Sequence, residues 1–394
     1  MKSNSIIEPT PTREPEDTDV RQQRVKAWNP ILDPVYVILG FLGIGALFIP
    51  TGWKLRQISD NVKEYGLQYD GPDEDFDDDG SPCAIGVANE GRKCQISFNV
   101  TEEMEAPIMV YYEIENFHQN HRIYSVSRDS AQLLGSLKQD RRIAKLCDPL
   151  NKLGDVIINP CGLIANTFFN DVFKIDLEFT NGNIEMIEDG IAWQSDLEYK
   201  FNQVDGYQEK ICGDTCDDEA CDCDIVDDDG KGAWSCKEPW FDEKENKCYL
   251  FSYPNDENTQ YLYETYPDTI SPREGVTNEH FVNWMRIASM PKFRKLYGVI
   301  NTDLRVNDKL TFDVTANWEV QSFKGKKTLV ITTASPFGGR NIQFGNSFLG
   351  VGSICVIAAA FFALKHLIKP RRLADKKFLK YNREDSNGNR PKME

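Results

Sequence analysis

The chain has 394 residues and a formal net charge of −17, with 45 Lys plus Arg against 62 Asp plus Glu. This acidic balance disfavours binding to nucleic acid or to anionic headgroups by bulk electrostatics. Length alone would allow two or three soluble domains, so the distribution of apolar residues has to decide the class of protein.

The N-terminal region divides into two parts of different composition. Residues 1–20 are rich in Pro, Glu, Asp, Thr and Ser and hold almost nothing to bury, which predicts a disordered tail. Residues 21–33 instead place Trp28, Pro30 and Ile31 among basic residues, directly before an apolar stretch. This second part is predicted to be an interfacial segment, with its tryptophan at headgroup level.

Two apolar stretches, residues 34–55 and 344–368, are each long enough to cross a hydrocarbon core of about 30 Å as a helix. The first carries no charge until Lys54, and the second carries none until Lys365. A cleavable signal peptide is a poor alternative for the first, because a tail of mixed charge precedes it and no small-residue cleavage site follows. Both stretches contain glycines, which allow close packing of the two spans together or against helices of a partner.

Basic residues set the expected orientation. Arg21, Arg24 and Lys26 precede the first span, and seven Lys and Arg residues follow the second between positions 365 and 380. Lys and Arg near span ends stay on the cytoplasmic side, so both termini are expected in the cytosol, including a C-terminal tail at 369–394. Residues 56–343 would then form a lumenal or extracellular domain. Residues 54–340 carry 30 Lys plus Arg against 52 Asp plus Glu, so the acidity lies in this domain.

Ten of the eleven cysteines lie between the two spans, an even number that predicts disulfides in an oxidising compartment. Local pairing would close loops of about a dozen residues, each worth roughly 3 kcal/mol by the chain-entropy estimate, although spacing alone leaves the connectivity open. Cys355, inside the second span, is expected to be a small apolar filler. The ten are Cys83, Cys94, Cys147, Cys161, Cys212, Cys216, Cys221, Cys223, Cys236 and Cys248.

Residues 212–248 concentrate six cysteines and many carboxylates, which predicts a self-contained disulfide-rich insertion. Zinc or calcium is the alternative, because thiolates suit zinc and carboxylates suit calcium. Oxidation competes with thiolate ligation, and the acidic runs at 75–80 and 224–230 have Gly86 and Cys236 in the positions where the bidentate glutamate of a calcium loop belongs. No metal and no cofactor are therefore expected.

The domain between the spans reads as mainly β. Helices are expected at 58–68, as a brief extension of the first span, at 130–145, and from 279 to about 291. One glycosylation sequon, at Asn99, fits the lumenal assignment. Runs rich in β-branched and aromatic residues predict strands at 96–100, 108–117, 172–179, 310–323 and 327–334.

Enzyme signatures are missing from the sequence: it has no Walker phosphate loop, no GxSxG elbow and no HExxH pair. The chain holds only four histidines, of which His118 and His121 lie three apart. A non-enzymatic role is therefore expected.

Several long sequence blocks together resemble the cell-cycle-control-protein-50 family, the β-subunits of type IV P-type ATPases that flip phospholipids between leaflets. Their order along the chain, between and around two spans, makes chance agreement improbable. The blocks are QQRVKAWNPIL at 22–32, PCGLIANTFFND at 160–171, GIAWQSD at 190–196, FVNWMRIASMPKFRKLYGVI at 281–300 and GGRN at 338–341.

The resemblance implies a two-span membrane protein with a sandwich-like, mainly antiparallel β domain of the α+β class, closed by disulfides that pair Cys83 with Cys94 and Cys147 with Cys161. It implies a heterodimer with the ATPase, contact with membrane lipid, and a role in the folding, export and activity of the catalytic subunit, in the endoplasmic reticulum, Golgi, endosome or plasma membrane. The chain departs from the family at Val172, which removes a sequon after Asn170, and in its cysteine-rich insertion. Candidates for partner contact are Trp28, Pro30, Trp284, Phe293 and Tyr297, with burial in the domain core as the alternative for Trp284 and Phe293.

Two other functions remain open at this stage. A receptor or adhesion glycoprotein would act through the same domain by binding a ligand of its own. A lumenal thiol oxidoreductase would use Cys221 and Cys223, although a CxC pair without a redox-domain pattern is common in structural knots.

Overall fold

The computed structural model describes residues 17–22, 25, 33–72, 81, 83–137, 145–178, 180, 184–216, 239–242, 245–254, 256–335 and 337–370. The chain forms two compact units. One contains the apolar helices at the two ends of the chain, and the other spans Ile58–Asn341.

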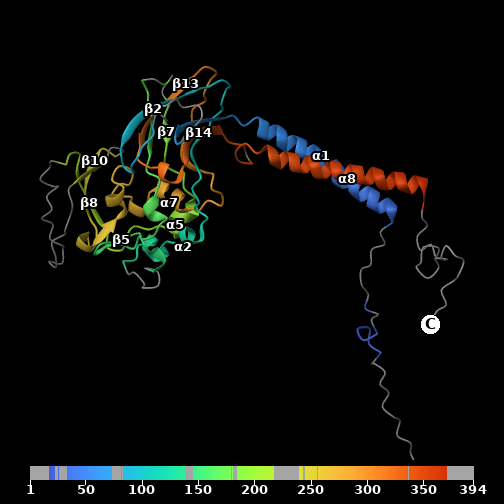
Figure 1. Cartoon of the computed structure of the whole chain (residues 1–394), viewed down its shortest axis with the longest axis horizontal. Helices are drawn as coiled ribbons and strands as arrows, with labels where there is room; N and C mark the ends of the chain where they lie inside the picture. Colours follow the sequence, from blue (N-terminus) through green and yellow to red (C-terminus); the bar gives the residue numbers. More distant parts are fainter. Residues whose placement is uncertain are drawn as a thin grey trace, which may run out of the picture. The chain divides into compact units, whose positions relative to one another are not determined.

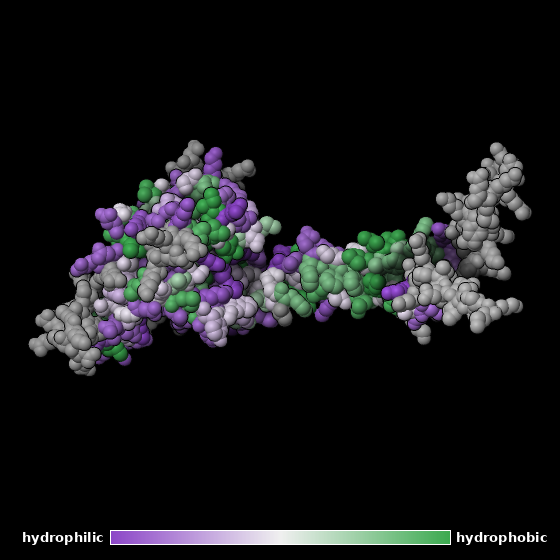
Figure 2. All heavy atoms as spheres, turned by 90° about the horizontal axis from the view of Figure 1, so that it is seen from below, coloured by the Kyte–Doolittle hydropathy of each residue, from purple (hydrophilic) through white to green (hydrophobic). Residues whose placement is uncertain are grey.

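The first unit holds two long helices, α1 (Pro34–Asp60) and α8 (Ile342–Ile368), of 27 residues each. Both are apolar enough to cross a membrane, and at 1.5 Å per residue each is about 40 Å long, more than a hydrocarbon core requires. Figure 2 shows hydrophobic surface along this pair. The helices contain the two expected spans.

The second unit is built around a five-stranded sheet in the order β1-β14-β3-β12-β7, with every neighbouring pair antiparallel. The central strand β3 buries alternate residues, from Ile108 to Ile114, on one face. The strands are β1 (Glu64–Asp70), β3 (Ile108–Glu115), β7 (Met186–Ile187), β12 (Phe293–Ile300) and β14 (Lys326–Thr333).

A second antiparallel sheet, in the order β2-β13-β6, covers the first. Its strands are β2 (Arg92–Asn99), β6 (Val172–Ile175) and β13 (Lys309–Ala316). The ring of Phe173 from β6 lies 5.6 Å from Tyr69 of β1 and 4.9 Å from Tyr297 of β12, measured between ring centroids. The two sheets therefore enclose one aromatic core, and the predicted mainly antiparallel, sandwich-like class is confirmed.

Two small sheets and several short helices complete this unit (Figure 1). One sheet has the order β8-β10-β9, and the other has the order β11-β5-β4 with β11 and β5 parallel. The strands are β4 (Lys152–Leu153), β5 (Val156–Asn159), β8 (Gln208–Gly213), β9 (Trp240–Asp242), β10 (Lys247–Ser252) and β11 (Thr259–Tyr261). The helices are α2 (Arg122–Val126), α3 (Ser130–Leu133), α5 (Gln194–Tyr199), α6 (Leu262–Thr265) and α7 (Glu279–Met285), with 3-10 turns η1 (Ala165–Thr167), η3 (Asp256–Asn258), η4 (Gly275–Thr277) and η5 (Gln321–Phe323).

Three helix predictions need correction. Within the helix expected at 130–145, α3 ends at Leu133, because Gly135 has φ +97° and a β-carbon there would lie 2.6 Å from the carbonyl oxygen of Gln203. Residues 138–144 of that range lie outside the described residues. The helix expected to reach about residue 291 ends at Met285. The expected extension of the first span is cut short at Asp60, and β1 follows instead, since pairing with β14 satisfies its backbone.

Candidate functional site

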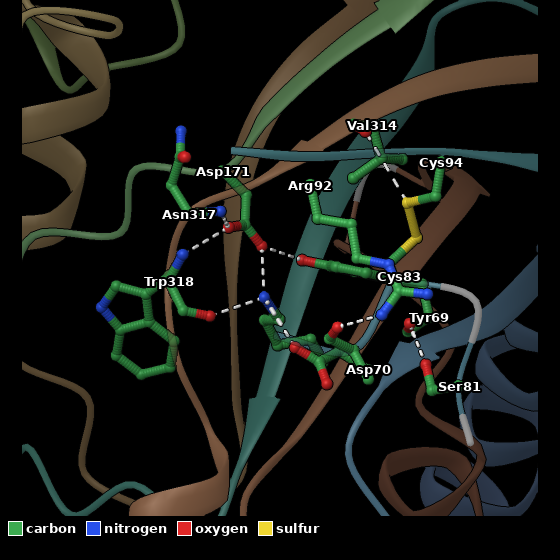
Figure 3. Close-up of a disulfide and its surroundings, with 12 residues drawn as sticks. Tyr69, Asp70, Ser81, Cys83, Arg92, Cys94, Asp171, Val314, Asn317 and Trp318 are labelled. Atoms are coloured by element: carbon green, nitrogen blue, oxygen red, sulfur yellow. Dashed lines mark hydrogen bonds and ion pairs between the residues drawn. A yellow bond between two sulfur atoms is a disulfide. The ribbon is translucent and has the colours of Figure 1, made fainter. Parts of the chain in front are cut away.

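A buried network of charges connects the two sheets (Figure 3). The ammonium group of Lys327, on β14, is fully buried, 2.8 Å from an oxygen of Asp171 and 3.0 Å from one of Asp70. It also donates to the carbonyl of Trp318, at 2.6 Å. One cation thus joins β14, the end of β1 and the start of β6.

Asp171 has further partners in this network. Its Oδ1 accepts the backbone N–H groups of Asn317 and Trp318, at 2.6 and 2.7 Å, and its Oδ2 accepts the hydroxyl of Tyr69, at 2.8 Å. Burial raises the pKa of Asp70 even though Lys327 favours its charged form. A network with this many partners holds the loop after β13 in a single conformation.

The Cys83–Cys94 disulfide lies next to this network. The backbone N–H of Cys83 donates to the carbonyl of Tyr69, and Cys94 sits on β2 opposite Val314. The bond therefore fastens the end of β1 to the second sheet, close to the buried charges.

The other disulfides stabilise the far end of the domain. Cys147 pairs with Cys161, and the N–H of Cys161 donates to the side chain of Gln132 at 2.8 Å. Both this bond and the Cys83–Cys94 bond match the pairings that the resemblance implied. A third bond joins Cys216 to Cys248. Cys221, Cys223 and Cys236, together with both acidic runs, lie outside the described residues.

Three candidate contact residues lie in the core. Trp284 is fully buried and donates its indole N–H to the carbonyl of Ile164 at 2.8 Å. Phe293 is 8 % exposed and Tyr297 is 5 % exposed. All three pack around the aromatic core, which is the alternative given for Trp284 and Phe293, and their contact with a partner stays a prediction. Trp28 and Pro30 lie outside the described residues.

Charged groups also anchor the end of α7. Lys295 donates to the carbonyl oxygens of Asn283, Trp284 and Arg286, where the last turn of the helix lacks internal partners. Burial, reinforced by the charge of Arg286, lowers the pKa of Lys295 to about 7. Asp196 accepts from Arg286 at 2.6 Å and so joins α5 to the residue after α7.

The glycines of α1 and α8 fall into two groups, those packed against the opposite helix and those with open space around them. β-Carbons at Gly45, Gly52, Gly345 and Gly352 would lie within 3 Å of the opposite helix, so these four glycines lie in the contact between α1 and α8. Along α8 the buried residues Gly345, Gly352, Cys355 and Ala359 recur at the spacing of a coiled-coil seam. Glycines 40, 43 and 350 have nothing within 4 Å among the described residues and remain open for another helix.

The sequon lies where a glycan could be attached. Asn99 is exposed at the end of β2, and Thr101 is exposed beside it. The hydroxyl of Tyr65 lies 2.9 Å from that of Thr101. Among the described residues, no group of three or more His, Cys, Asp or Glu side chains is arranged to hold a metal ion.

Sequence reasoning missed the buried charges. Asp171 and Asp196 do lie inside the blocks that carry the family resemblance, at 160–171 and 190–196. Lys327 and Asp70 lie outside those blocks. A lysine in an alternating strand is expected to face solvent, so nothing in the sequence pointed to the burial of Lys327.

The two apolar helices define a two-span membrane protein, and the disulfide-closed β domain lies between the two spans in the sequence. The sequence profile of the LEM3 (ligand-effect modulator 3) family, also called the CDC50 family, matches residues 55–372. The chain belongs to this family, and the predicted family is confirmed.

Named relatives align with most of the chain. The sequence is 34 % identical to "ALA-interacting subunit 3" of Arabidopsis thaliana, over 94 % of this chain and 92 % of the relative. It is 32 % identical to "Cell cycle control protein 50A" of Bos taurus, over 87 % and 86 %. It is 29 % identical to the "Phospholipid-transporting ATPase accessory subunit CDC50" of Chaetomium thermophilum, over 96 % and 93 %.

Proposed function

We propose that this chain is the non-catalytic accessory (β) subunit of a phospholipid flippase, bound to a type IV P-type ATPase as its catalytic subunit. The observation that carries this proposal is the family match over 55–372 together with full-length relatives named as accessory or interacting subunits. The complex would move aminophospholipids and maintain membrane asymmetry. The subunit would support the ATPase's folding, export from the endoplasmic reticulum and activity.

The geometry suits a protein that binds and holds another protein. The buried charges Lys327, Asp171 and Asp70 stabilise the domain's own architecture. Open glycines on α1 and α8 allow an ATPase helix to approach closely. A rigid domain of this kind can shift the conformational equilibrium of the ATPase by binding one state of its lumenal loops more tightly than another.

The proposed topology places both termini in the cytosol and the domain at 58–341 in the lumen or outside the cell, because basic residues flank the outer ends of both spans. In this arrangement residues 1–20 and 369–394 are cytosolic tails, 21–33 is an interfacial segment, and Trp28 and Pro30 contact the ATPase near the membrane. Asn99 carries a glycan. The complex resides in the endoplasmic reticulum, Golgi, endosome or plasma membrane.

Affinity purification of the tagged full chain from native membranes tests this function. A P-type ATPase is expected in equal amount, with lipid-stimulated ATPase activity that falls when the chain is depleted. A well-folded chain that repeatedly emerges without an ATPase would contradict the proposal and favour a domain with a ligand of its own.

A further inference from the structure

The β domain contains a cavity of about 580 Å³ beside β6, β7, α7 and β12. Its apolar lining includes the rings of Tyr112, Phe169 and Tyr297 together with Val172, Met186 and Ile187. The rings of Tyr112 and Phe169 stack with centroids 3.9 Å apart, and the ring of Tyr297 meets Tyr112 edge-on at 6.5 Å. This stacking covers one face of Tyr112 and one face of Phe169, and Tyr297 completes the aromatic part of the cavity wall.

Carboxylates predominate among the charged residues that line this cavity. Glu185, Glu188, Asp189 and Asp268 line it, whereas Lys174 is the one lysine or arginine among the described lining residues. Glu185 and Asp268 are exposed and make no ion pair with any described residue. The negative potential here is therefore only partly neutralised by the domain's own cations.

Two polar groups in the cavity lack partners. Tyr112 is 2 % exposed, and within the described part of the chain its hydroxyl makes no hydrogen bond. His280 uses Nε2 to contact Glu188 at 2.9 Å, which leaves its buried Nδ1 without a partner in the same part of the chain. The Tyr112 hydroxyl is therefore available to accept a hydrogen bond from an occupant of the cavity.

Aromatic faces, surrounding carboxylates and an unused hydroxyl together match a cationic nitrogen group. A guanidinium or ammonium is attracted to the face of an aromatic ring, pairs with carboxylates and donates to a hydroxyl oxygen. We propose that this cavity receives a lysine or arginine side chain from a lumenal loop of the ATPase. The inference rests on the proposed function, which supplies the partner, and charge complementarity selects a basic segment of that partner.

The test compares full-length chains purified with their bound ATPase through a series of rising NaCl concentrations. Glu185→Gln with Asp268→Asn removes two charges without changing side-chain shape, and Glu185→Lys with Asp268→Lys reverses them. Glu103→Gln with Glu105→Gln is the matched control, because both residues are exposed on the same domain away from the cavity. Tyr112→Phe removes only the unused hydroxyl.

Neutralisation is expected to lower the amount of ATPase retained by about tenfold at intermediate salt, and reversal is expected to lower it further. Tyr112→Phe should weaken retention severalfold, and the control should match wild type. Retention of the ATPase by both cavity variants at the wild-type level would overturn this inference alone. Absence of the ATPase from the wild-type preparation would instead contradict the proposed function.

A photo-cross-linking residue at position 268 distinguishes a protein side chain from a small ammonium compound. In the intact complex it is expected to join an ATPase peptide that contains a lysine or arginine. An intact complex in which position 268 cross-links to no protein would overturn the inference and leave the cavity to a small ligand.

Discussion

Lys327 shows how one buried residue can decide the stability of a whole domain. Its ammonium group is removed from water, and Asp70, Asp171, the carbonyl of Trp318 and the ring of Tyr69 compensate for the lost hydration. Removing one partner from such a pair is far more costly than the pair's net contribution, because the remaining charges stay buried without compensation.

Lys327→Met is therefore expected to lower the free energy of unfolding by about 3–5 kcal/mol. Urea denaturation of the purified chain, followed by tryptophan fluorescence, measures this change. The neighbouring Lys326→Met, at a half-buried position on the same strand, should change it by less than about 1 kcal/mol. Equal effects of the two substitutions would contradict the assigned role of the network.

Asp196 is a second residue whose charge contributes to the stability of the fold. Burial raises its pKa, but hydrogen bonds from Lys200 and Arg286 outweigh burial and hold the pKa below the ordinary value. A carboxylate with a lowered folded-state pKa contributes stability above its unfolded pKa and loses that contribution as the pH falls through the folded value.

Asp196→Asn should accordingly lower the urea midpoint at pH 7, and the difference from wild type should shrink as the pH falls below about 4. Glu198→Gln, on the exposed face of α5, is the control and should shift the midpoint little at any pH. A difference between Asp196→Asn and wild type that stays constant from pH 7 to pH 3 would show that the charge of Asp196 contributes nothing.

Among the helices, α1 and α8 pack against each other through glycines, and other glycines of the same two helices have open space around them. Gly352 lies against Ile49 of α1, where a β-carbon would come within 2.8 Å of a side-chain atom. Gly350, two residues earlier, has open space around it. In lipid, association of helices depends on such close van der Waals packing, because apolar surface gains nothing by leaving the acyl chains.

Gly352→Leu is expected to force the helices apart, whereas Gly350→Leu should leave the pair intact. Cysteines placed at Phe48 and Phe348, whose rings lie 5.2 Å apart, report this contact through oxidative cross-linking in a Cys355→Ala background. Cross-linking should slow roughly threefold or more with Gly352→Leu. Unchanged cross-linking in both variants would argue against the glycine contact.

At the scale of the whole molecule, the two proposed spans place the β domain on one side of the membrane and both tails on the other. The single sequon, at Asn99, lies on an exposed strand end of that domain. Glycosylation machinery and disulfide formation both act on the lumenal side, so the sequon and the three disulfides agree with the proposed topology.

Asn99→Gln should abolish the mass decrease that glycosidase treatment produces in the wild-type chain. In sealed microsomes, added protease should remove the tails and leave residues 58–341 protected. Digestion of the β domain in sealed vesicles would contradict the proposed orientation.

Composition and local periodicity predicted the class of the protein and much of its β content. Two long apolar stretches, ten cysteines between them and the basic flanks are properties of composition, and composition is visible without a fold. Alternation of β-branched and aromatic residues indicated β2, β3, β6, β13 and β14, since strand periodicity is local.

Which residues are buried depends on packing between distant segments, and the sequence alone does not show it. The helical pattern of 279–291 could not distinguish core from contact surface, because an apolar face looks the same in either role, and packing placed Trp284 in the core. Lys327, Asp70 and Asp171 lie far apart along the chain, so their charges become a network only when β1, β6 and β14 are brought together. The cavity beside β7 has the same origin, because its aromatic lining and its carboxylates come from separate segments that only the packed sheets bring together.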